Sequence, residues 1–459
     1  MSSQILKLAF VHPDLGIGGA ERLVVDAAVG LQTKGHQVVI YTSHHDPTHC
    51  FEETRNDTLE VRVRGNYIIP RTFFGSFYII CAILRQIHLT LSMIFWDRAK
   101  YDVIFVDQLS ASVPLLRLTG AKVLFYCHFP DKLLTQRESL IKKIYRYPVD
   151  LIEELTTDMA NCIVVNSKFT AKIFHESFPH IKRTPRVLYP GIHFDSYDKK
   201  VDLKDKSVEI LETSKKIILS INRFERKKNI ILAIHAFAKL RDDNLISANQ
   251  FNNLRLVIAG GYDYRVQENV DHHKELYQEA SKLELKPSTL MPGSAELQPE
   301  NSENSQVIFL CSFNEPQRTY LLSKALCLLY TPSNEHFGIV PVEAMYARLP
   351  VIAINNGGPK ETVKDRITGL LCSSTPMAFS QAIASFINGE YDRDNMGDQG
   401  RKHVQKIFSL EAFVNTLEEI LMQLIKDSSP FSLLNPLSLW LSLTIALILY
   451  YVYQYPYIF

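Results

Sequence analysis

Two glutamates, Glu335 and Glu343, stand eight residues apart in the sequence EHFGIVPVEAM. A turn and the start of a helix between them would let both carboxylates reach different hydroxyl groups of one polyhydroxylated ligand through charge-assisted hydrogen bonds. Gly338 lies between the two and would open the backbone to a phosphate group at the helix N-terminus. An isolated pair of glutamates is equally compatible with exposed helix charge, so the motif needs support from the rest of the chain.

A cluster of cations follows a strand predicted at residues 217–221, in the sequence RFERKKN that starts at Arg223 and includes Lys228. Cations at the carboxyl end of a strand fall where open α/β sheets bind ligands, and paired Arg and Lys side chains suit a diphosphate. The alternative is a solvated basic turn without a ligand.

A glycine-rich turn, HPDLGIGGAE, joins a predicted strand at residues 6–11 to a helical pattern. Its Gly18 and Gly19 would let the backbone approach a ligand, and the first N–H groups of the helix favour an anion. The spacing differs from the G-x-G-x-x-G of dinucleotide enzymes. A tight turn without a ligand is the alternative.

Two successive series of βα units are expected to position these motifs. The first has strands at 6–11, 36–42, 103–107, 122–127 and 161–166, and the second at 217–221, 255–259, 307–310, 326–330 and 351–354. This alternation predicts an α/β fold with two Rossmann-like lobes facing a cleft. We expect lobes at 1–197 and 217–408, a charged linker at 198–216 and a closing helix at 409–427.

Composition excludes several classes of protein. The 459 residues include 50 Lys plus Arg, 49 Asp plus Glu and 46% apolar residues, which excludes a disordered chain and gives no basic field for nucleic acid. The seven cysteines form no C-x-x-C pair, so neither a zinc site nor a disulfide framework is indicated. Dispersed cysteines of odd number fit reduced thiols in the cytosol.

Two segments are suited to a membrane. Residues 428–459 contain no charged residue or His, and the apolar run at 437–453 is long enough for a C-terminal hydrophobic membrane anchor with an aromatic belt. The second lies within residues 67–96, where a helix at 76–96 would carry Arg85, His88 and Ser92 on one side. We expect this helix to lie in the interface with its basic side toward head groups. A transmembrane span and a buried helix of the first lobe are the alternatives.

The three motifs, in this order, resemble those of the retaining nucleotide-sugar glycosyltransferases of family four, which have the GT-B fold. The resemblance covers about residues 5–425. The sequences HPDLGIGGAER, YCHFPD and NRFERKKN are most similar to the GDP-mannose-dependent α-1,3/α-1,6-mannosyltransferases that extend a dolichol-linked oligosaccharide for N-glycosylation.

The resemblance implies a role for each polar motif residue. Arg223 and Lys228 would grip the donor diphosphate and neutralise the leaving group, Glu343 would bind the ribose, and Glu335 would contact the transferred mannose. The family uses no bound metal because these cations do its work, and the sequence offers no D-x-D pair in a site context. GDP-mannose would be the donor substrate, with no permanently bound cofactor.

The resemblance also implies contacts for backbone groups and one histidine. The backbone at Gly338 and Ile339 would meet the phosphates, while Gly18 and Gly19 would line the cleft from the first lobe. His128, in YCHFPD, would lie near the reacting sugar; without the resemblance, a lone histidine is more often structural.

The expected function is a membrane-associated retaining mannosyltransferase of the endoplasmic reticulum, with its lobes facing the cytosol. It would add one α-1,3 and one α-1,6 mannose to the mannosylated chitobiosyl diphosphodolichol intermediate. The lipid bilayer and other enzymes of the pathway are expected partners, and nucleic acid is not. The alternatives are a related lipid glycosyltransferase with another nucleotide sugar, and a catalytically silent scaffold that binds nucleotide sugars.

Overall fold

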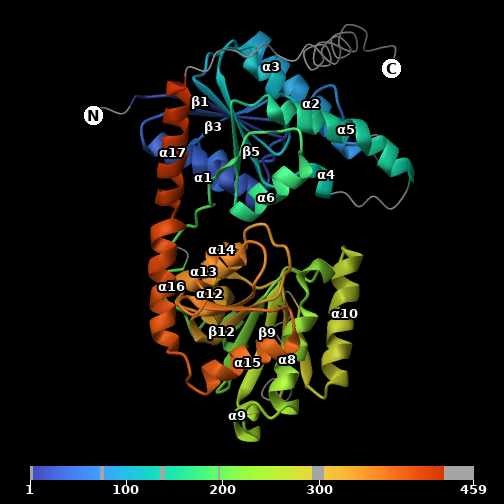
Figure 1. The fold of residues 1–459 in the computed structure, drawn as a ribbon, viewed down its shortest axis with the longest axis vertical. Coiled ribbons are helices and arrows are strands. Elements are labelled where there is room, and N and C mark those ends of the chain that lie inside the picture. The colour runs from blue at the N-terminus through green and yellow to red at the C-terminus, as the bar shows by residue number, and fades with distance from the viewer. Residues whose placement is uncertain (1–3, 73–76, 135–139, 195–196, 292–303, 428–459) are drawn as a thin grey trace. The chain divides into compact units, whose positions relative to one another are not determined.

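The computed structural model describes residues 4–72, 77–134, 140–194, 197–291 and 304–427 (Figure 1). The chain divides into two compact units, residues 1–191 with 410–459, and residues 192–409. The expected anchor at 428–459 lies outside the described residues. Residues 198–216, expected as a linker, belong to the second unit, where Asp198 accepts a hydrogen bond from Arg401.

The first unit is built on a parallel sheet of seven strands in the order β3-β2-β1-β4-β5-β6-β7. The strands are β1 (Lys7–His12), β2 (Gln37–Thr42), β3 (Glu60–Val63), β4 (Val103–Asp107), β5 (Lys122–Cys127), β6 (Cys162–Val165) and β7 (Arg186–Val187). The chain order reverses between β1 and β4, which is where open parallel sheets bind ligands at their carboxyl ends.

Helices cover both faces of this sheet. They are α1 (Gly19–Thr33), α2 (Tyr78–Ser92), α3 (Val113–Arg117), α4 (Asp131–Leu134), α5 (Leu140–Asp158), α6 (Lys168–Ser177) and α17 (Leu410–Lys426), with the 3₁₀-helix η1 (Glu52–Thr54) and the π-helix η2 (Met93–Asp97). The C-terminal helix α17 packs on α1 through Val414, Leu417 and Leu421. A Cβ at Gly30 would lie 2.2 Å from Val414 Cγ2, so this glycine allows the two helices to approach.

Helix α2 buries polar side chains alongside apolar ones such as Ile87 and Leu89. Arg85 is only 9% exposed and donates to the carbonyl of Ser43 at 2.7 Å, and Gln86 donates to the carbonyl of Leu109 at 3.0 Å. The expectation that Arg85 faces lipid head groups is therefore wrong, because its guanidinium caps a loop of its own unit. Tyr78 and Trp96 stay more than 60% exposed at the two ends of the helical segment.

The segment Tyr78–Asp97 has the length and composition of a membrane span, and among the described residues it is the one helix that does. Less than half of its most apolar stretch is buried. A helix in the core of a soluble protein can meet the same criteria.

The second unit repeats the architecture with the strand order β10-β11-β9-β8-β12-β13-β14, all neighbours parallel. Its strands are β8 (Lys216–Ile221), β9 (Leu254–Gly260), β10 (Pro287–Leu290), β11 (Val307–Cys311), β12 (Ala325–Tyr330), β13 (Val351–Ile354) and β14 (Gly369–Cys372). The order reverses between β8 and β12. The expected α/β fold with two Rossmann-like lobes is confirmed.

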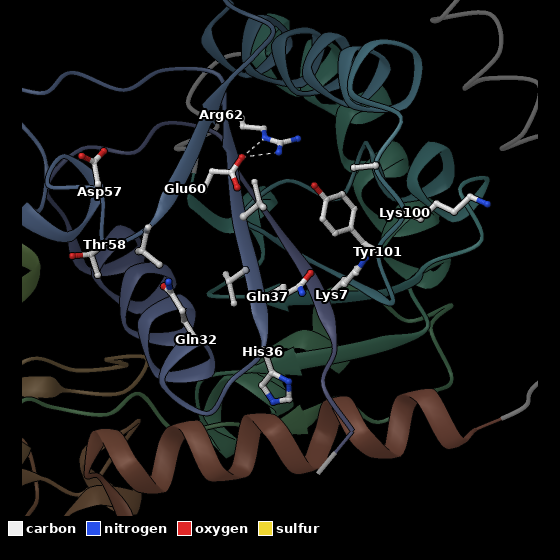
Figure 2. A pocket seen from close by; sticks show the side chains of 14 residues that line it. Lys7, Gln32, His36, Gln37, Asp57, Thr58, Glu60, Arg62, Lys100 and Tyr101 are labelled. Atoms are coloured by element: carbon white, nitrogen blue, oxygen red, sulfur yellow. Dashed lines mark hydrogen bonds and ion pairs between the residues drawn. The ribbon is translucent and has the colours of Figure 1, made fainter. Parts of the chain in front are cut away.

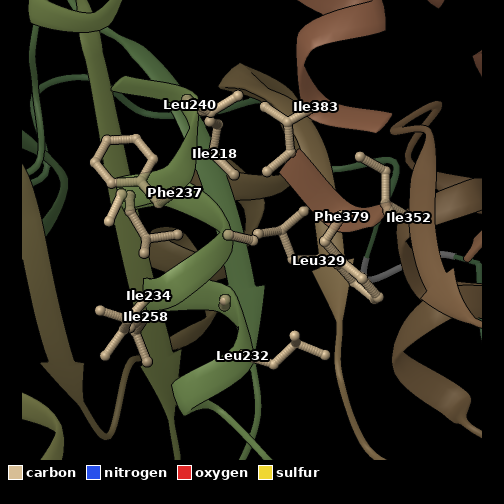
Figure 3. Packing of buried hydrophobic residues seen from close by; sticks show 14 of the residues in the cluster. Ile218, Leu232, Ile234, Phe237, Leu240, Ile258, Leu329, Ile352, Phe379 and Ile383 are labelled. Atoms are coloured by element: carbon tan, nitrogen blue, oxygen red, sulfur yellow. The ribbon is translucent and has the colours of Figure 1, made fainter. Parts of the chain in front are cut away.

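The core of the second unit lies between its sheet and its helices. These are α7 (Lys206–Glu209), η3 (Arg226–Lys228), α8 (Ile231–Asp242), α9 (Ala248–Asn252), α10 (Gln267–Lys282), α12 (Glu315–Lys324), α13 (Ile339–Tyr346), α14 (Pro359–Thr362), α15 (Pro376–Ile387) and α16 (Arg393–Ile407). Figure 3 shows Phe237 of α8 and Phe379 and Ile383 of α15 packed near Ile218 of β8. This apolar layer fixes the two central strands whose ends carry the predicted site residues.

Candidate functional site

The loops that follow β8 and β12 bring the basic motif and the first glutamate together. Lys228 Nζ lies 2.6 Å from Glu335 Oε2, and the two side chains are 14% and 23% exposed. The hydroxyl of Thr331, the residue after β12, donates to the backbone carbonyl of Lys228 at 2.9 Å and ties the loops together. An ion pair therefore forms between residues 107 positions apart in the chain.

Arg223 is an exposed cation of the same basic motif. Its side chain is 66% exposed, and its guanidinium lies 3.2 Å from Glu225. The neighbouring glycines make room for this loop: a Cβ at Gly260 would lie 1.7 Å from the carbonyl oxygen of Asn222, and one at Gly261 would lie 3.2 Å from Arg223 Cγ. The Arg223 side chain is thus open to solvent while its loop packs closely on these glycines.

Glu335 is held from the other side by Tyr330 and by its own backbone. Burial and the neighbouring carboxylate of Glu335, to which the hydroxyl is hydrogen-bonded, raise the pKa of Tyr330. The carbonyl of Glu335 accepts from the N–H of Gly358 at 2.7 Å, and a Cβ at Gly358 would lie 2.1 Å from the carbonyl oxygen of Phe337. Gly358 is therefore needed for the close approach that shapes the Glu335 loop.

The N-terminus of α13 lies directly after this loop. Gly338 has φ of +81°, a left-handed conformation that favours glycine, and no side chain caps the helix. The first backbone N–H groups of α13 therefore have no side-chain acceptor. Ile339, the first residue of the helix, is 38% exposed. Such a helix start favours an anionic group.

Glu343, on α13, is held by two residues that the sequence did not point to. The hydroxyl of Tyr197 donates to Glu343 Oε1 at 2.5 Å, and Arg318 Nη1 lies 3.8 Å from the same oxygen. The Arg318 guanidinium also stacks on the Tyr197 ring at 4.5 Å. Burial raises the pKa of Glu343, although Tyr197 and Arg318 act in the opposite direction.

The first unit carries a separate polar cluster at the carboxyl ends of β1, β4 and β5. Asp107 is fully buried and lies 2.8 Å from His12 Nδ1 and 3.0 Å from His128 Nε2. On its other side, His12 Nε2 lies 3.7 Å from Glu21 of α1. The sequence predicted His128 but not Asp107 or His12, because each ends an apolar strand and no local pattern connects them.

The charged groups of this cluster shift one another's pKa values. Burial alone would lower the pKa of His12. The nearby carboxylates of Asp107 and then Glu21 outweigh this effect and raise the pKa from 6.5 to about 10. Burial would raise the pKa of Asp107, but His12 and His128 hold it below its usual value. Both shifts favour the ion pair, with an imidazolium at His12 and a carboxylate at Asp107.

Gly18 and Gly19 lie in the same unit at the start of α1, and they differ in their surroundings. Gly18 has extended backbone with φ of −173°, so its backbone would accept any residue. A Cβ there would, however, lie 2.3 Å from Glu21 Oε2, whereas a Cβ at Gly19 would meet no atom within 4 Å. Gly18 thus leaves the space into which the Glu21 carboxylate folds.

A cavity of about 810 Å³ lies elsewhere, at the amino ends of the first unit's strands. Figure 2 shows that Lys7, Gln37 and Glu60, from the starts of β1, β2 and β3, line it together with Lys100 and Tyr101. No predicted site residue lines this cavity. Since α/β sheets bind ligands at their carboxyl ends, we assign it no role.

Two family models match the chain. "Glycosyltransferase Family 4" matches residues 17–196, and "Glycosyl transferases group 1" matches residues 202–403. These ranges contain all the predicted site residues.

Known proteins are similar over almost the whole chain. The chain is 60% identical to "Alpha-1,3/1,6-mannosyltransferase ALG2" of Rhizomucor pusillus, over 94% of both chains. It is 46% identical to the protein of the same name from Dictyostelium discoideum, over 91% of this chain and 98% of that one. Among solved structures, a sucrose-phosphate synthase from Thermosynechococcus elongatus superimposes with a TM-score of 0.67 at 19% identity, over 92% of this chain and all of that one, which shows a shared fold.

Proposed function

The chain belongs to the α-1,3/1,6-mannosyltransferase family of glycosyltransferases, and on that premise we propose that it transfers mannose from GDP-mannose to mannosylated chitobiosyl diphosphodolichol. It adds one α-1,3 and one α-1,6 mannose. The observation that carries the donor assignment is the Lys228–Glu335 ion pair at the carboxyl edge of the second unit, in the loop that leads into a helix start without a side-chain cap.

The cations of the cluster stabilise the leaving group. The bond between the anomeric carbon and the diphosphate breaks, a bond from that carbon to the acceptor oxygen forms on the same face, and the acceptor proton passes to the departing phosphate. Negative charge grows on GDP as the sugar becomes oxocarbenium-like, so fixed positive charge from Arg223 and Lys228 lowers the barrier. Diphosphate binding would draw Lys228 partly away from Glu335.

The two carboxylates and the N-terminus of α13 bind the mannose, ribose and phosphate groups of the donor. Glu335, held by Lys228 and Tyr330, accepts hydrogen bonds from mannose hydroxyls. Glu343, oriented by Tyr197, accepts from the ribose, and the backbone N–H groups at Gly338 and Ile339 bind phosphate oxygens. In the first unit, His128 contacts the reacting sugar, and Gly18 and Gly19 line the substrate site.

The acceptor carries a polyisoprenol chain, so the enzyme must work at a bilayer. We propose that it resides at the endoplasmic reticulum membrane with its catalytic units in the cytosol. The exposed aromatic residues Tyr78, Phe95 and Trp96 of the first unit support contact with a membrane, since aromatic side chains favour the membrane interface.

One assay tests the proposal. Purified protein is incubated with GDP-mannose and a synthetic monomannosyl chitobiosyl lipid diphosphate, and the products are weighed by mass spectrometry. Two added hexoses are expected. Transfer from another sugar nucleotide alone would indicate a related lipid glycosyltransferase, and binding without transfer from any donor would indicate a scaffold.

A further inference from the structure

The cluster His12, Asp107 and His128 fixes the orientation of one imidazole ring. Asp107 Oδ2 lies 3.0 Å from His128 Nε2, and the carboxylate has no exposed surface. A carboxylate only accepts hydrogen bonds, so His128 must donate through Nε2–H. The remaining nitrogen of a neutral ring, Nδ1, is then an acceptor.

The rest of His128 is equally constrained. Its backbone carbonyl accepts from the side-chain amide of Asn166 at 3.1 Å, and its ring packs edge-on against Tyr126 with centroids 4.8 Å apart. The side chain is 24% exposed, and among the described residues no protein group is hydrogen-bonded to Nδ1. A hydroxyl group arriving from solvent can therefore donate to Nδ1.

The His12 side chain keeps Asp107 in place. Both side chains are fully buried, and His12 Nδ1 lies 2.8 Å from one carboxylate oxygen and 3.0 Å from the other. The positive charge of His12 compensates Asp107, while Glu21, admitted by the missing side chain at Gly18, faces the far nitrogen of His12 at 3.7 Å. Successive contacts therefore connect Glu21, beside the glycine-rich turn, through His12 and Asp107 to the His128 ring.

We propose that Asp107, held by His12, is a positioning residue that keeps His128 in the Nε2-protonated tautomer so that Nδ1 accepts a hydrogen bond from a hydroxyl of the reacting sugar. The placement of the sugar beside His128 rests on the proposed function. The tautomer and ring orientation do not depend on it. The rival interpretation is a buried ion pair that stabilises the first unit without acting on His128.

A spectroscopic test addresses the ring itself. The protein is labelled with ¹⁵N-histidine, and the His128 signal is identified by its loss in His128→Gln. We expect an Nε2-protonated tautomer in the unmodified protein and a changed tautomer or ring environment in Asp107→Asn. An Nδ1-protonated or averaged ring in the unmodified protein would overturn the proposal, whether or not Asp107→Asn folds.

A kinetic test separates positioning from stability. Asp107→Asn should lower kcat by about 10²-fold, the usual cost of a misplaced group, with the KM for GDP-mannose changed less than about 2-fold. In a His128→Ala background the same change should have almost no further effect on kcat, because its route of action is gone. Multiplicative effects in the double variant, or a loss of thermal stability with kcat intact, would refute positioning.

The second unit offers a matched control. His235 Nε2 lies 3.0 Å from Glu279 Oε1, so Glu279→Gln makes the same carboxylate-to-amide change beside a histidine. This variant should keep kcat within about 2-fold. If the unmodified protein makes no product from GDP-mannose, the proposed function fails, and the tautomer measurement still decides the inference.

Discussion

Replacing Lys228 by alanine gives the sharpest test of the donor site. The substitution removes the cation that lies 2.6 Å from Glu335 and leaves that carboxylate with Tyr330 as its neighbour. The donor diphosphate then loses one preorganised charge contact and faces an uncompensated carboxylate. Such a contact contributes about 3 kcal/mol to the transition state, which corresponds to a loss of about 10²-fold in kcat/KM.

The folded state should suffer much less than catalysis. Glu335 is 23% exposed, so water partly replaces the lost partner, and we expect a loss of about 1 kcal/mol in the free energy of unfolding. Initial rates with GDP-mannose and the synthetic acceptor measure the first effect, and chemical denaturation measures the second. Calorimetric titration with GDP should show weaker binding.

Lys227 provides the control. It is one residue away, 69% exposed and paired with Glu225 at 3.0 Å. Lys227→Ala should keep kcat/KM within about 3-fold, because an exposed pair contributes little. Near-normal turnover in a folded Lys228→Ala protein, or an equal loss in Lys227→Ala, would refute the assignment of Lys228 to the diphosphate.

Four further outcomes are expected. Gly18→Ala should reduce kcat by at least about 10-fold, because the new Cβ would lie 2.3 Å from Glu21 Oε2. Gly19→Ala should keep the melting temperature of the unmodified protein, because its Cβ would meet no atom within 4 Å. Equal melting temperatures and equal rates in the two variants would contradict the role given to Gly18. Gly358→Ala should lower the melting temperature and GDP affinity together, since its Cβ would lie 2.1 Å from the Phe337 carbonyl and displace the Glu335 loop; unchanged GDP titrations would count against it. The pKa of His12 is raised from 6.5 to about 10, so the stability that its charge contributes is complete below pH 6.5 and is lost as the pH rises toward 10. The melting temperature of the unmodified protein should therefore fall more steeply over this pH range than that of His12→Gln. Parallel curves for the two proteins would be inconsistent with a charged His12–Asp107 pair. Deleting residues 430–459 should shift the protein from a carbonate-resistant membrane fraction toward peripheral association, and unchanged resistance would argue against an anchor there.

The sequence identified the central strands of both sheets but none of the four edge strands. Central strands such as β4 and β9 are buried along their whole length and are continuous apolar runs. The edge strands β3, β7, β10 and β14 are two to four residues long and partly exposed, so they lack that signal. Pairing with a neighbour makes them strands.

The sequence by itself determined the fold class and the motif residues, because each motif sits within a few residues of a strand end and the chain connectivity carries it to the ligand edge of its sheet. Only the tertiary structure decided which residues support them. Asp107 meets His12 across 95 positions, and Tyr197 meets Glu343 across 146. The tertiary structure also decided that Arg85 is buried, because a backbone carbonyl of a neighbouring loop accepts its hydrogen bond. Neither partner of such a contact leaves a local pattern, because the contact depends on strand order and not on spacing along the chain.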